Sequence, residues 1–374
     1  MNRHQMQNHC FYKRLSTLLF ISSTLCFLLL SGCEIPGSTN QQASSTPSIP
    51  TPIPTSTIST TLKNQADTQL QTFQQWISLM QGYHADVTAY QQQYEGDQSA
   101  LHNALTATSF QAVLSTLNTH VENIKIPALK AEAKTLQQKL AQQVASWGQN
   151  HTYYDSYNGT TYPLGFEYGP TGIGSWSQDD LNQAKTVADY QQAIENLQMY
   201  LTNFQAMTTN STDQTPYNQV HQTDLQLLKH YNKLDGKAIL VSLSEEAVRI
   251  YNQGQLITAF LATTGQPDLP TPPGIWWIES KVTHTTFKTN APKDSPFWYP
   301  PTPINYAMQY HSNGYFLHDS WWRVDYGRGT NFPHADASGN TSSTRGSHGC
   351  VNISTDNAKW IYDFAQLYTA IIIY

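Results

Sequence analysis

The spacing of apolar residues changes once along this chain, at Asp235-Gly236, and no other feature limits its fold as much. Upstream, from Leu62 onward, apolar residues recur every three or four positions, which is the period of amphipathic helices. Downstream, short β-branched and aromatic runs alternate with turn residues, as is typical of strands in hairpins. We therefore predict a multidomain α and β protein, with a helical bundle over 62–235 and a mostly β domain over 236–374.

The helical part is predicted to contain five helices. Pro127 ends one apolar stripe and Gly148 another, and a Tyr- and Gly-rich interruption runs from 153 to 175. The helices are expected over about 62–87, 110–124, 129–147, 178–204 and 219–231. Such a bundle is either a packed spacer that positions the second domain or a module that binds a partner.

The second part is predicted to be mostly strands, with one helix near its end. Residues 356–368 have helical spacing, and Ser354 or Thr355 before them suits an N-cap. The strands are expected at 238–243, 247–251, 256–261, 275–278, 315–317 and 370–374.

Residues 1–33 are predicted to be an export signal, because a basic start precedes a hydrophobic run that ends in Leu30-Ser31-Gly32-Cys33. These last four residues resemble the lipobox of bacterial lipoproteins. The resemblance implies that Cys33 carries a lipid and becomes the mature N-terminus. An ordinary cleaved signal and an uncleaved anchor are the alternatives, and all three place the remainder outside the cytoplasm.

Residues 34–61 are expected to be a disordered tether rich in Ser, Thr and Pro, because they contain almost no large apolar side chain. Only 12% of the whole chain is Asp, Glu, Lys or Arg, and its formal net charge is -6. This composition argues against nucleic acid as a partner, since no basic stripe exists to displace counterions from phosphates.

One of the four cysteines is expected to be the only unmodified thiol of the exported protein. Cys10 and Cys26 fall in the leader and Cys33 is the predicted lipid site, which leaves Cys350. A single cysteine in an oxidising compartment has no disulfide partner, so it is either a buried apolar residue or a reactive thiol. The polar turn Ser347-His348-Gly349 before Cys350 favours a reactive thiol.

A reactive thiol needs a base near it, because the thiolate is the nucleophile and the ordinary thiol pKa lies near 8.5. The candidate bases are His311, His318, His334 and His348. His348 would share the turn of Cys350, whereas His318 would be held rigidly at a strand end. Gly349 permits a tight turn whose amides could face a developing oxyanion.

The same histidines, with Asp319 and Cys350, also raise the alternative of a metal site. No pair among them has CxxC or HExxH spacing, so the sequence favours the thiol chemistry. No cofactor is expected.

The segment Ser347-His348-Gly349-Cys350-Val351-Asn352 resembles the signature of the L,D-transpeptidases, the YkuD-type catalytic domain of bacterial cell-wall synthesis. Three further segments follow in the family's order: an opening hairpin at 239–254, Thr264-Gly265 with Thr271-Pro272-Pro273-Gly274, and Phe316-Leu317-His318. The resemblance covers about residues 236–374 and says nothing about the helical part.

The resemblance implies that Cys350 is the nucleophile and His318 the general base. Asp319 stands where related enzymes often use a serine carbonyl to orient the base, and a carboxylate so close would raise the pKa of the histidine. The interval from His318 to the motif is longer than usual, so we expect residues 320–346 to form a lid or a wall of the substrate groove.

Other residues have supporting roles by the same resemblance. Ser347 and His348 are expected to shape the turn, and Asn352 to fix the loop through backbone hydrogen bonds. Arg345 either pairs with a substrate carboxylate or is an exposed loop residue.

The implied reaction is acyl transfer on a peptidoglycan stem peptide. Cys350 attacks the carbonyl of the diamino acid before a terminal D-alanine, which leaves, and the stem remains as a thioester until an acceptor resolves it. Another stem as acceptor gives a cross-link, and water gives L,D-carboxypeptidase trimming. A lipid-anchored wall-binding protein without activity is the remaining alternative. The expected partners are stem peptides and, through the lipid, the membrane.

Overall fold

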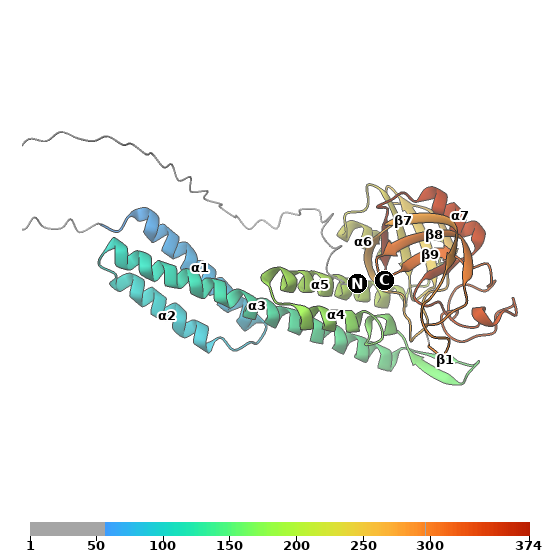
Figure 1. The fold of residues 1–374 in the computed structure, drawn as a ribbon, viewed down its shortest axis with the longest axis horizontal. Coiled ribbons are helices and arrows are strands. Elements are labelled where there is room, and N and C mark those ends of the chain that lie inside the picture. The colour runs from blue at the N-terminus through green and yellow to red at the C-terminus, as the bar shows by residue number, and fades with distance from the viewer. Residues whose placement is uncertain (1–56, 296) are drawn as a thin grey trace, which may run out of the picture. The chain divides into compact units, whose positions relative to one another are not determined.

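The computed structural model describes residues 57–295 and 297–374. The predicted leader, Cys33 and nearly all of the predicted tether lie outside these residues. The helices are α1 (Thr60–Gly82), α2 (Thr88–Asn103), α3 (Ala107–Asn150), α4 (Ile173–Gln183), α5 (Val187–Asn210), α6 (Gln222–His230) and α7 (Thr355–Phe364), with short 3-10 turns η1 (Phe166–Tyr168) and η2 (Thr341–Ser343). The predicted order, a helical part and then a β-rich part, is confirmed (Figure 1).

The strands fall into three sheets. A hairpin of β1 (Thr152–Asp155) and β2 (Thr160–Pro163) stands alone. The remaining strands are β3 (Lys237–Ser242), β4 (Ala247–Asn252), β5 (Gln255–Leu261), β6 (Gly274–Trp277), β7 (Ser280–Phe287), β8 (Thr302–His311), β9 (Tyr315–Asp319), β10 (Val351–Ile353) and β11 (Ala370–Ile373). They form a five-stranded sheet in the order β5-β4-β3-β11-β6 and a four-stranded sheet in the order β10-β9-β8-β7.

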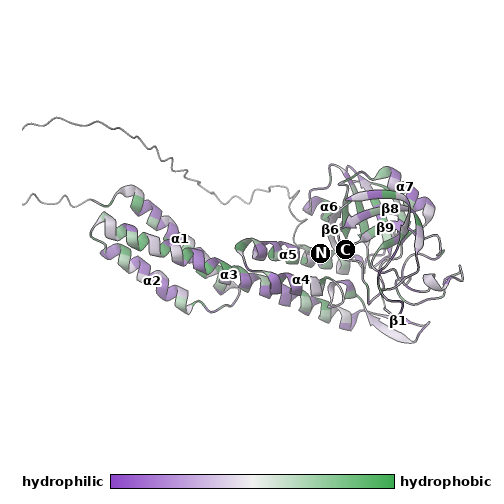
Figure 2. Ribbon diagram, viewed as in Figure 1, coloured by the Kyte–Doolittle hydropathy of each residue, from purple (hydrophilic) through white to green (hydrophobic). Residues whose placement is uncertain are grey.

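The helices α1, α2 and the first half of α3 share a core of their own. Phe73 and Ile77 of α1 lie there with Leu117 and Ile124 of α3, all without exposed surface. Figure 2 shows apolar and hydrophilic residues interspersed along these helices, as amphipathic packing requires. The expected first helix, 62–87, is shorter than predicted, since α1 ends at Gly82 and the separate helix α2 follows.

The two helices predicted on either side of Pro127 are in fact one helix, α3, which contains this proline. An internal proline removes one backbone hydrogen bond and costs about 3 kcal/mol. Burial on both sides offsets this cost, because Ile124 and Ala128 belong to the first core while Leu129 and Ala133 belong to a second. Each fully buried aliphatic side chain contributes about 1.5–3 kcal/mol. The proline rule alone therefore gave a wrong boundary.

The interruption predicted at 153–175 contains the β1–β2 hairpin, η1 and the start of α4. The single helix expected over 178–204 is divided into α4 and α5. The division is fixed by a capping box, in which Thr186 accepts from the Asp189 amide and the Asp189 side chain accepts from the Thr186 amide.

The second core continues without a break from the helical part into the β-rich part. It includes Leu197 and Phe204 of α5 together with Ile239 of β3 and Ile372 of β11. The predicted strands of the opening hairpins and the closing strand β11 are confirmed, whereas β7, β8 and β10 were not predicted. Two of the strand pairs are parallel, β3 with β11 and β9 with β10.

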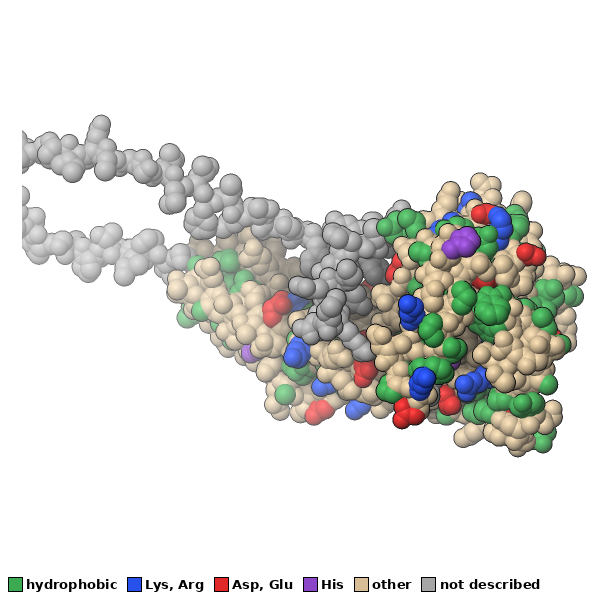
Figure 3. All heavy atoms as spheres, turned by 45° about the vertical axis from the view of Figure 1, so that its right-hand side comes forward, with side chains coloured by type: hydrophobic (Ala, Val, Ile, Leu, Met, Phe, Trp, Pro, Cys, Tyr) green, Lys and Arg blue, Asp and Glu red, His purple; other side chains and the backbone are tan. Residues whose placement is uncertain are grey.

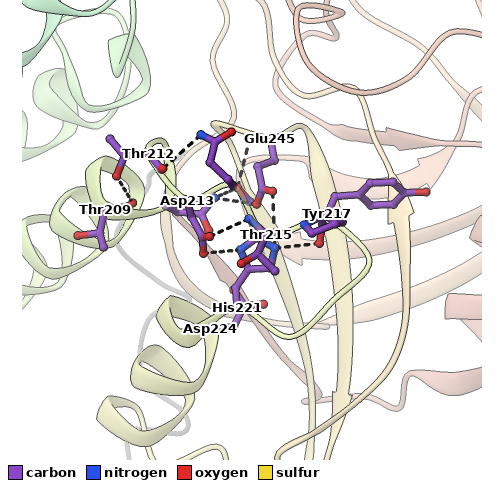
Figure 4. Close-up of polar contacts among 12 residues, drawn as sticks. Thr209, Thr212, Asp213, Thr215, Tyr217, His221, Asp224 and Glu245 are labelled. Atoms are coloured by element: carbon purple, nitrogen blue, oxygen red, sulfur yellow. Dashed lines mark hydrogen bonds and ion pairs between the residues drawn. The ribbon is translucent and has the colours of Figure 1, made fainter.

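Buried polar contacts also join the two parts. Arg249 of β4 donates from Nε to Asp224 of α6 at 2.5 Å and from Nη1 to Glu245 at 2.7 Å, and all three side chains are almost fully buried. Figure 4 shows the polar cluster around His221 and Asp224, which faces Glu245. Asn203 of α5 donates to the Ile373 carbonyl at 2.8 Å. A buried pair of this kind is costly to break, because removal of one partner leaves the other charge buried without an opposite charge.

Candidate active site

The segment Ser347–Cys350 is a tight turn directly before β10. Gly349 has φ +103°, a conformation that L-residues rarely adopt. An added Cβ there would lie 2.5 Å from Cε1 of Tyr315, so the turn needs a glycine for both reasons. The Ser347 hydroxyl donates to the Cys350 carbonyl at 2.5 Å and accepts from the Gly349 amide at 3.0 Å. These two hydrogen bonds hold the backbone of the turn.

The Thr-Gly and Thr-Pro-Pro-Gly segments hold this turn from the other side. Gly265 pairs with Ser347, whose amide donates to the Thr264 carbonyl at 2.9 Å. The Thr271 hydroxyl accepts from the Gly265 amide and donates to the Gly349 carbonyl, both at 2.9 Å. Two segments that are distant in sequence therefore fix the backbone on which the thiol stands.

Cys350 lies next to β9. The parallel register sets Val351 beside Leu317 and Asn352 beside His318, and one step earlier Cys350 falls beside Phe316. Because side chains alternate along a strand, the Cys350 and His318 side chains leave the β9–β10 pair on the same face. Cys350 is partly exposed, yet burial raises the pKa of its thiol to about 11, and a hydrogen bond from the Phe316 backbone opposes this only in part.

His318 is buried and oriented by one hydrogen bond. Its Nδ1 donates to the Asp319 carbonyl at 2.7 Å, which leaves Nε2 to accept a proton. Burial lowers the pKa of His318 to about 4, and the Asp319 carbonyl and carboxylate offset this only in part. The pair is thus a neutral thiol and a neutral imidazole at pH 7.

Asp319 raises the pKa of His318, as expected, but burial lowers it by more, so the pKa of His318 falls overall. The carboxylate is also engaged elsewhere. It accepts from the Asn305 and Tyr306 amides and from the Asn305 side chain, each at 2.8 Å. Asp319 therefore orients His318 through its backbone carbonyl, as a serine could.

The other predicted residues occupy different environments. His348 packs against Tyr299 in a tilted arrangement, with ring centroids 5.4 Å apart. Asn352 pairs through its backbone with Thr263 in both directions at 2.9 Å. Arg345 is exposed, and its carbonyl accepts from the Arg323 guanidinium at 3.1 Å.

The two remaining histidines have contacts of their own. His311 packs against Trp176 at 5.2 Å and against Trp276 at 4.6 Å, and burial lowers its pKa to about 4. His334 bonds through Nδ1 to the Phe332 carbonyl at 2.7 Å. Over residues 57–295 and 297–374, no three His, Cys, Asp or Glu side chains gather closely enough to hold a metal ion.

Aromatic residues that the sequence did not indicate surround the thiol. A charge on Cys350 raises the pKa values of Tyr299, Tyr310 and Tyr315, although burial is the larger cause in each case. The ring of Tyr315 also contacts Trp176 of α4 at 5.9 Å. The helical part thereby supports a side chain that packs directly on the turn before Cys350. No local motif could have revealed a contact between segments so far apart in sequence.

The inserted segment 320–346 is clamped by the helical part. Phe332 stacks on Tyr153 of the β1–β2 hairpin at 4.3 Å and lies 5.1 Å from Tyr162 and 5.8 Å from Phe166. Trp322 of the same segment lies 6.2 Å from His318. The insertion therefore lies next to the predicted base and is held from outside the β-rich part.

A buried carboxylate supports the turn from the β3–β4 connection. Glu246 accepts from the Thr264 hydroxyl at 2.6 Å and from its amide, next to the residue that pairs with Ser347. Burial raises the pKa of Glu246 well above its usual range. The buried Arg323 opposes this increase only in part. The Thr330 hydroxyl of the insertion shares a hydrogen bond of 2.7 Å with Thr263, which connects the insertion to the residue before Thr264.

Residues 236–373 match the family model of YkuD, described as the L,D-transpeptidase catalytic domain. The expected resemblance of the β-rich part to this domain is thereby confirmed. Among curated proteins, the chain is 30% identical over 116 residues to L,D-transpeptidase 2 of Mycobacterium tuberculosis, a match that spans 30% of this chain and 25% of the relative. It is 26% identical over 151 residues to L,D-transpeptidase 1 of the same organism. This match spans 40% of this chain and 54% of the relative.

The chain thus spans a quarter to about half of the length of these relatives. Among solved structures, the catalytic domain of an Enterococcus faecium L,D-transpeptidase is 26% identical, with a TM-score of 0.31, over 37% of this chain and 98% of that one.

In the described part of the chain, no helix combines the length and apolarity needed to cross a bilayer. The face drawn in Figure 3 carries scattered cations and anions among mostly uncharged side chains, without a continuous basic stripe.

Proposed function

We propose that this protein is a peptidoglycan L,D-transpeptidase that uses Cys350 as nucleophile and His318 as general base. The observation that carries the proposal is the shared face of β9 and β10. On this face, the thiol follows a turn whose conformation requires Gly349. The imidazole of His318 is oriented by a hydrogen bond from Nδ1 to a backbone carbonyl, and Nε2 takes no part in that bond. The match of residues 236–373 to the YkuD family supports the assignment of class.

In the proposed reaction, Nε2 of His318 takes the thiol proton as sulfur attacks the carbonyl carbon of the diamino acid in a stem peptide. The carbon–nitrogen bond to the terminal D-alanine breaks, and the imidazolium returns its proton to the departing amine. A thioester remains on Cys350. The amine of a second stem then attacks this thioester, the carbon–sulfur bond breaks, and the thiolate regains a proton.

The neutral resting pair fits this sequence, because the proton moves to the base only during attack. The Gly349 amide is already bonded to Ser347, so oxyanion stabilisation would come from other donors than this one. Water in place of the second amine gives stem trimming, the alternative outcome of the same acyl-enzyme.

A carbapenem tests the proposed nucleophile. We expect the intact mass of the full chain to rise by one carbapenem in the wild type, not to rise in Cys350→Ala, and to rise normally in the matched control Cys33→Ser. A wild-type protein that remains unmodified would instead favour a wall-binding protein without activity. Incubation with tetrapeptide stems, followed by muropeptide analysis, then separates cross-linking from trimming.

We also propose that the protein is exported and attached to the membrane through a lipid on Cys33, facing the cell wall. The lipobox-like Leu30-Ser31-Gly32-Cys33 supports this location. Intact-mass measurement on protein extracted from membranes should show a diacylglyceryl addition that Cys33→Ser lacks. A wild-type mass without lipid would refute the anchor and leave the acyl-transfer proposal untouched.

A further inference from the structure

A groove of about 880 Å³ lies between α3 and α5, and we call it the α3–α5 groove. Its walls come from the last four turns of α3, from His151, and from the C-terminal half of α5. The catalytic mechanism uses none of its residues. Its volume falls within the range of ligand sites, about 300–1,000 Å³.

The side chains that line the groove are chiefly neutral hydrogen-bonding groups. Five are amides: Gln142, Gln143, Asn150, Gln198 and Gln205. Three more are hydroxyls, and no carboxylate lines the groove. Amides and hydroxyls both donate and accept hydrogen bonds, which matches a ligand rich in hydroxyl and acetamido groups. A single lysine, Lys139, is too little positive charge for a polyanion.

The groove also has an aromatic floor. Trp147 stacks on His151 with ring centroids 3.3 Å apart, and Phe204 lies in the same wall. The indole nitrogen of Trp147 is buried and has no hydrogen-bond partner among the residues that the structure describes. A buried indole N–H normally has an acceptor, and this unpartnered one belongs to a side chain that lines the groove.

Contacts connect the floor of the groove to the insertion beside the predicted base. Atoms of Trp147 and Phe204 lie within 3.4 Å of where a Cβ on Gly165 would stand. The next residue, Phe166, packs on Phe332 of the insertion at 5.8 Å. A polymer in the groove would therefore lie close to the segment that adjoins His318.

We propose that the α3–α5 groove binds the N-acetylhexosamine backbone of a glycan strand. The choice of the peptidoglycan glycan as the natural ligand rests on the proposed function, whereas the chemistry of an acetamido sugar follows from the groove itself. The helical part thus holds the strand while the stem peptide attached to it reaches Cys350. Single contacts are weak, and repetition along the polymer supplies the affinity.

Co-sedimentation of the full chain with an insoluble polymer of β-1,4-linked N-acetylglucosamine tests the site. We expect the wild type to bind this polymer and to bind cellulose, which lacks the acetamido groups, much less. The double variant Gln142→Ala/Gln205→Ala should bind about tenfold more weakly, because it loses two hydrogen-bonding side chains. Both positions are exposed, so their replacement leaves the cores intact.

The matched control is Gln138→Ala/Gln191→Ala, which removes two exposed glutamines of the same helices outside the groove and should bind as the wild type does. Carbapenem acylation should be equal in all variants. The inference is overturned if the wild type does not bind the polymer or if the two double variants bind it equally well. It is also overturned if roughly 0.5 M salt abolishes the binding, because such binding would be electrostatic. Glycan binding without acylation would refute the proposed function and leave the groove assignment standing.

Discussion

Replacement of Gly349 by alanine should damage the catalytic turn far more than a comparable replacement elsewhere. The φ of +103° alone costs an L-residue about 1–2 kcal/mol. The new Cβ would in addition stand 2.5 Å from Tyr315 Cε1 and 3.2 Å from the Pro270 carbonyl oxygen, so the ring or the turn must move. Such overpacking typically costs another 1–3 kcal/mol, which gives about 3 kcal/mol in total.

Gly159→Ala is the matched control, because Gly159 has φ +72° and a Cβ there would meet nothing within 4 Å. It should lose only the backbone part, about 1 kcal/mol, in urea unfolding. Carbapenem acylation should slow about 100-fold in Gly349→Ala, since displacement of the nucleophile by about 1 Å is enough for such a loss. Gly349→Ala/Tyr315→Leu should recover part of the rate. Equal unfolding and acylation in the Gly349 and Gly159 variants would refute the steric reasoning.

Three other perturbations test separate contacts. The pKa of His318 is near 4 and that of Cys350 near 11, so the acylation rate should decrease as the pH drops under about 4, where the base becomes protonated. The rate should stay level from about pH 5 to 9, and a decline between pH 7 and 9 would indicate a thiolate–imidazolium pair instead. Trp176→Ala removes the ring packed on Tyr315 and should slow acylation about tenfold, and an unchanged rate contradicts the support proposed for the turn. Arg249→Met leaves two carboxylates buried without their cation and should lower the unfolding free energy by about 3–5 kcal/mol, so a urea midpoint equal to that of the wild type would count against the buried pair.

The elements with a strong local pattern were predictable from the sequence. The hairpin strands β3, β4 and β5 and the closing strand β11 consist mostly of apolar residues. β7 was missed because its residues are mostly polar and partly exposed, so it is a strand by pairing with β8 and not by hydrophobic pattern. The fusion of two predicted helices across Pro127 depends on two cores, which no local rule contains.

The candidate site divides in the same way. The glycine turn and its cysteine stand out in the sequence, since their spacing is local. The contact of Trp176 with Tyr315 and the clamp on Phe332 are tertiary, so only the structure could reveal them. The low pKa of His318 also depends on burial, a property that a sequence motif does not state.

α3 is a single helix of 44 residues that belongs to both cores. At about 1.5 Å per residue it is a rod about 66 Å long, whereas a flexible chain of the same length would average roughly 35 Å between its ends. Because α3 contributes side chains to both cores, it connects them through one continuous element. Removal of whole turns from α3 would bring the two cores closer by about 5.4 Å per turn.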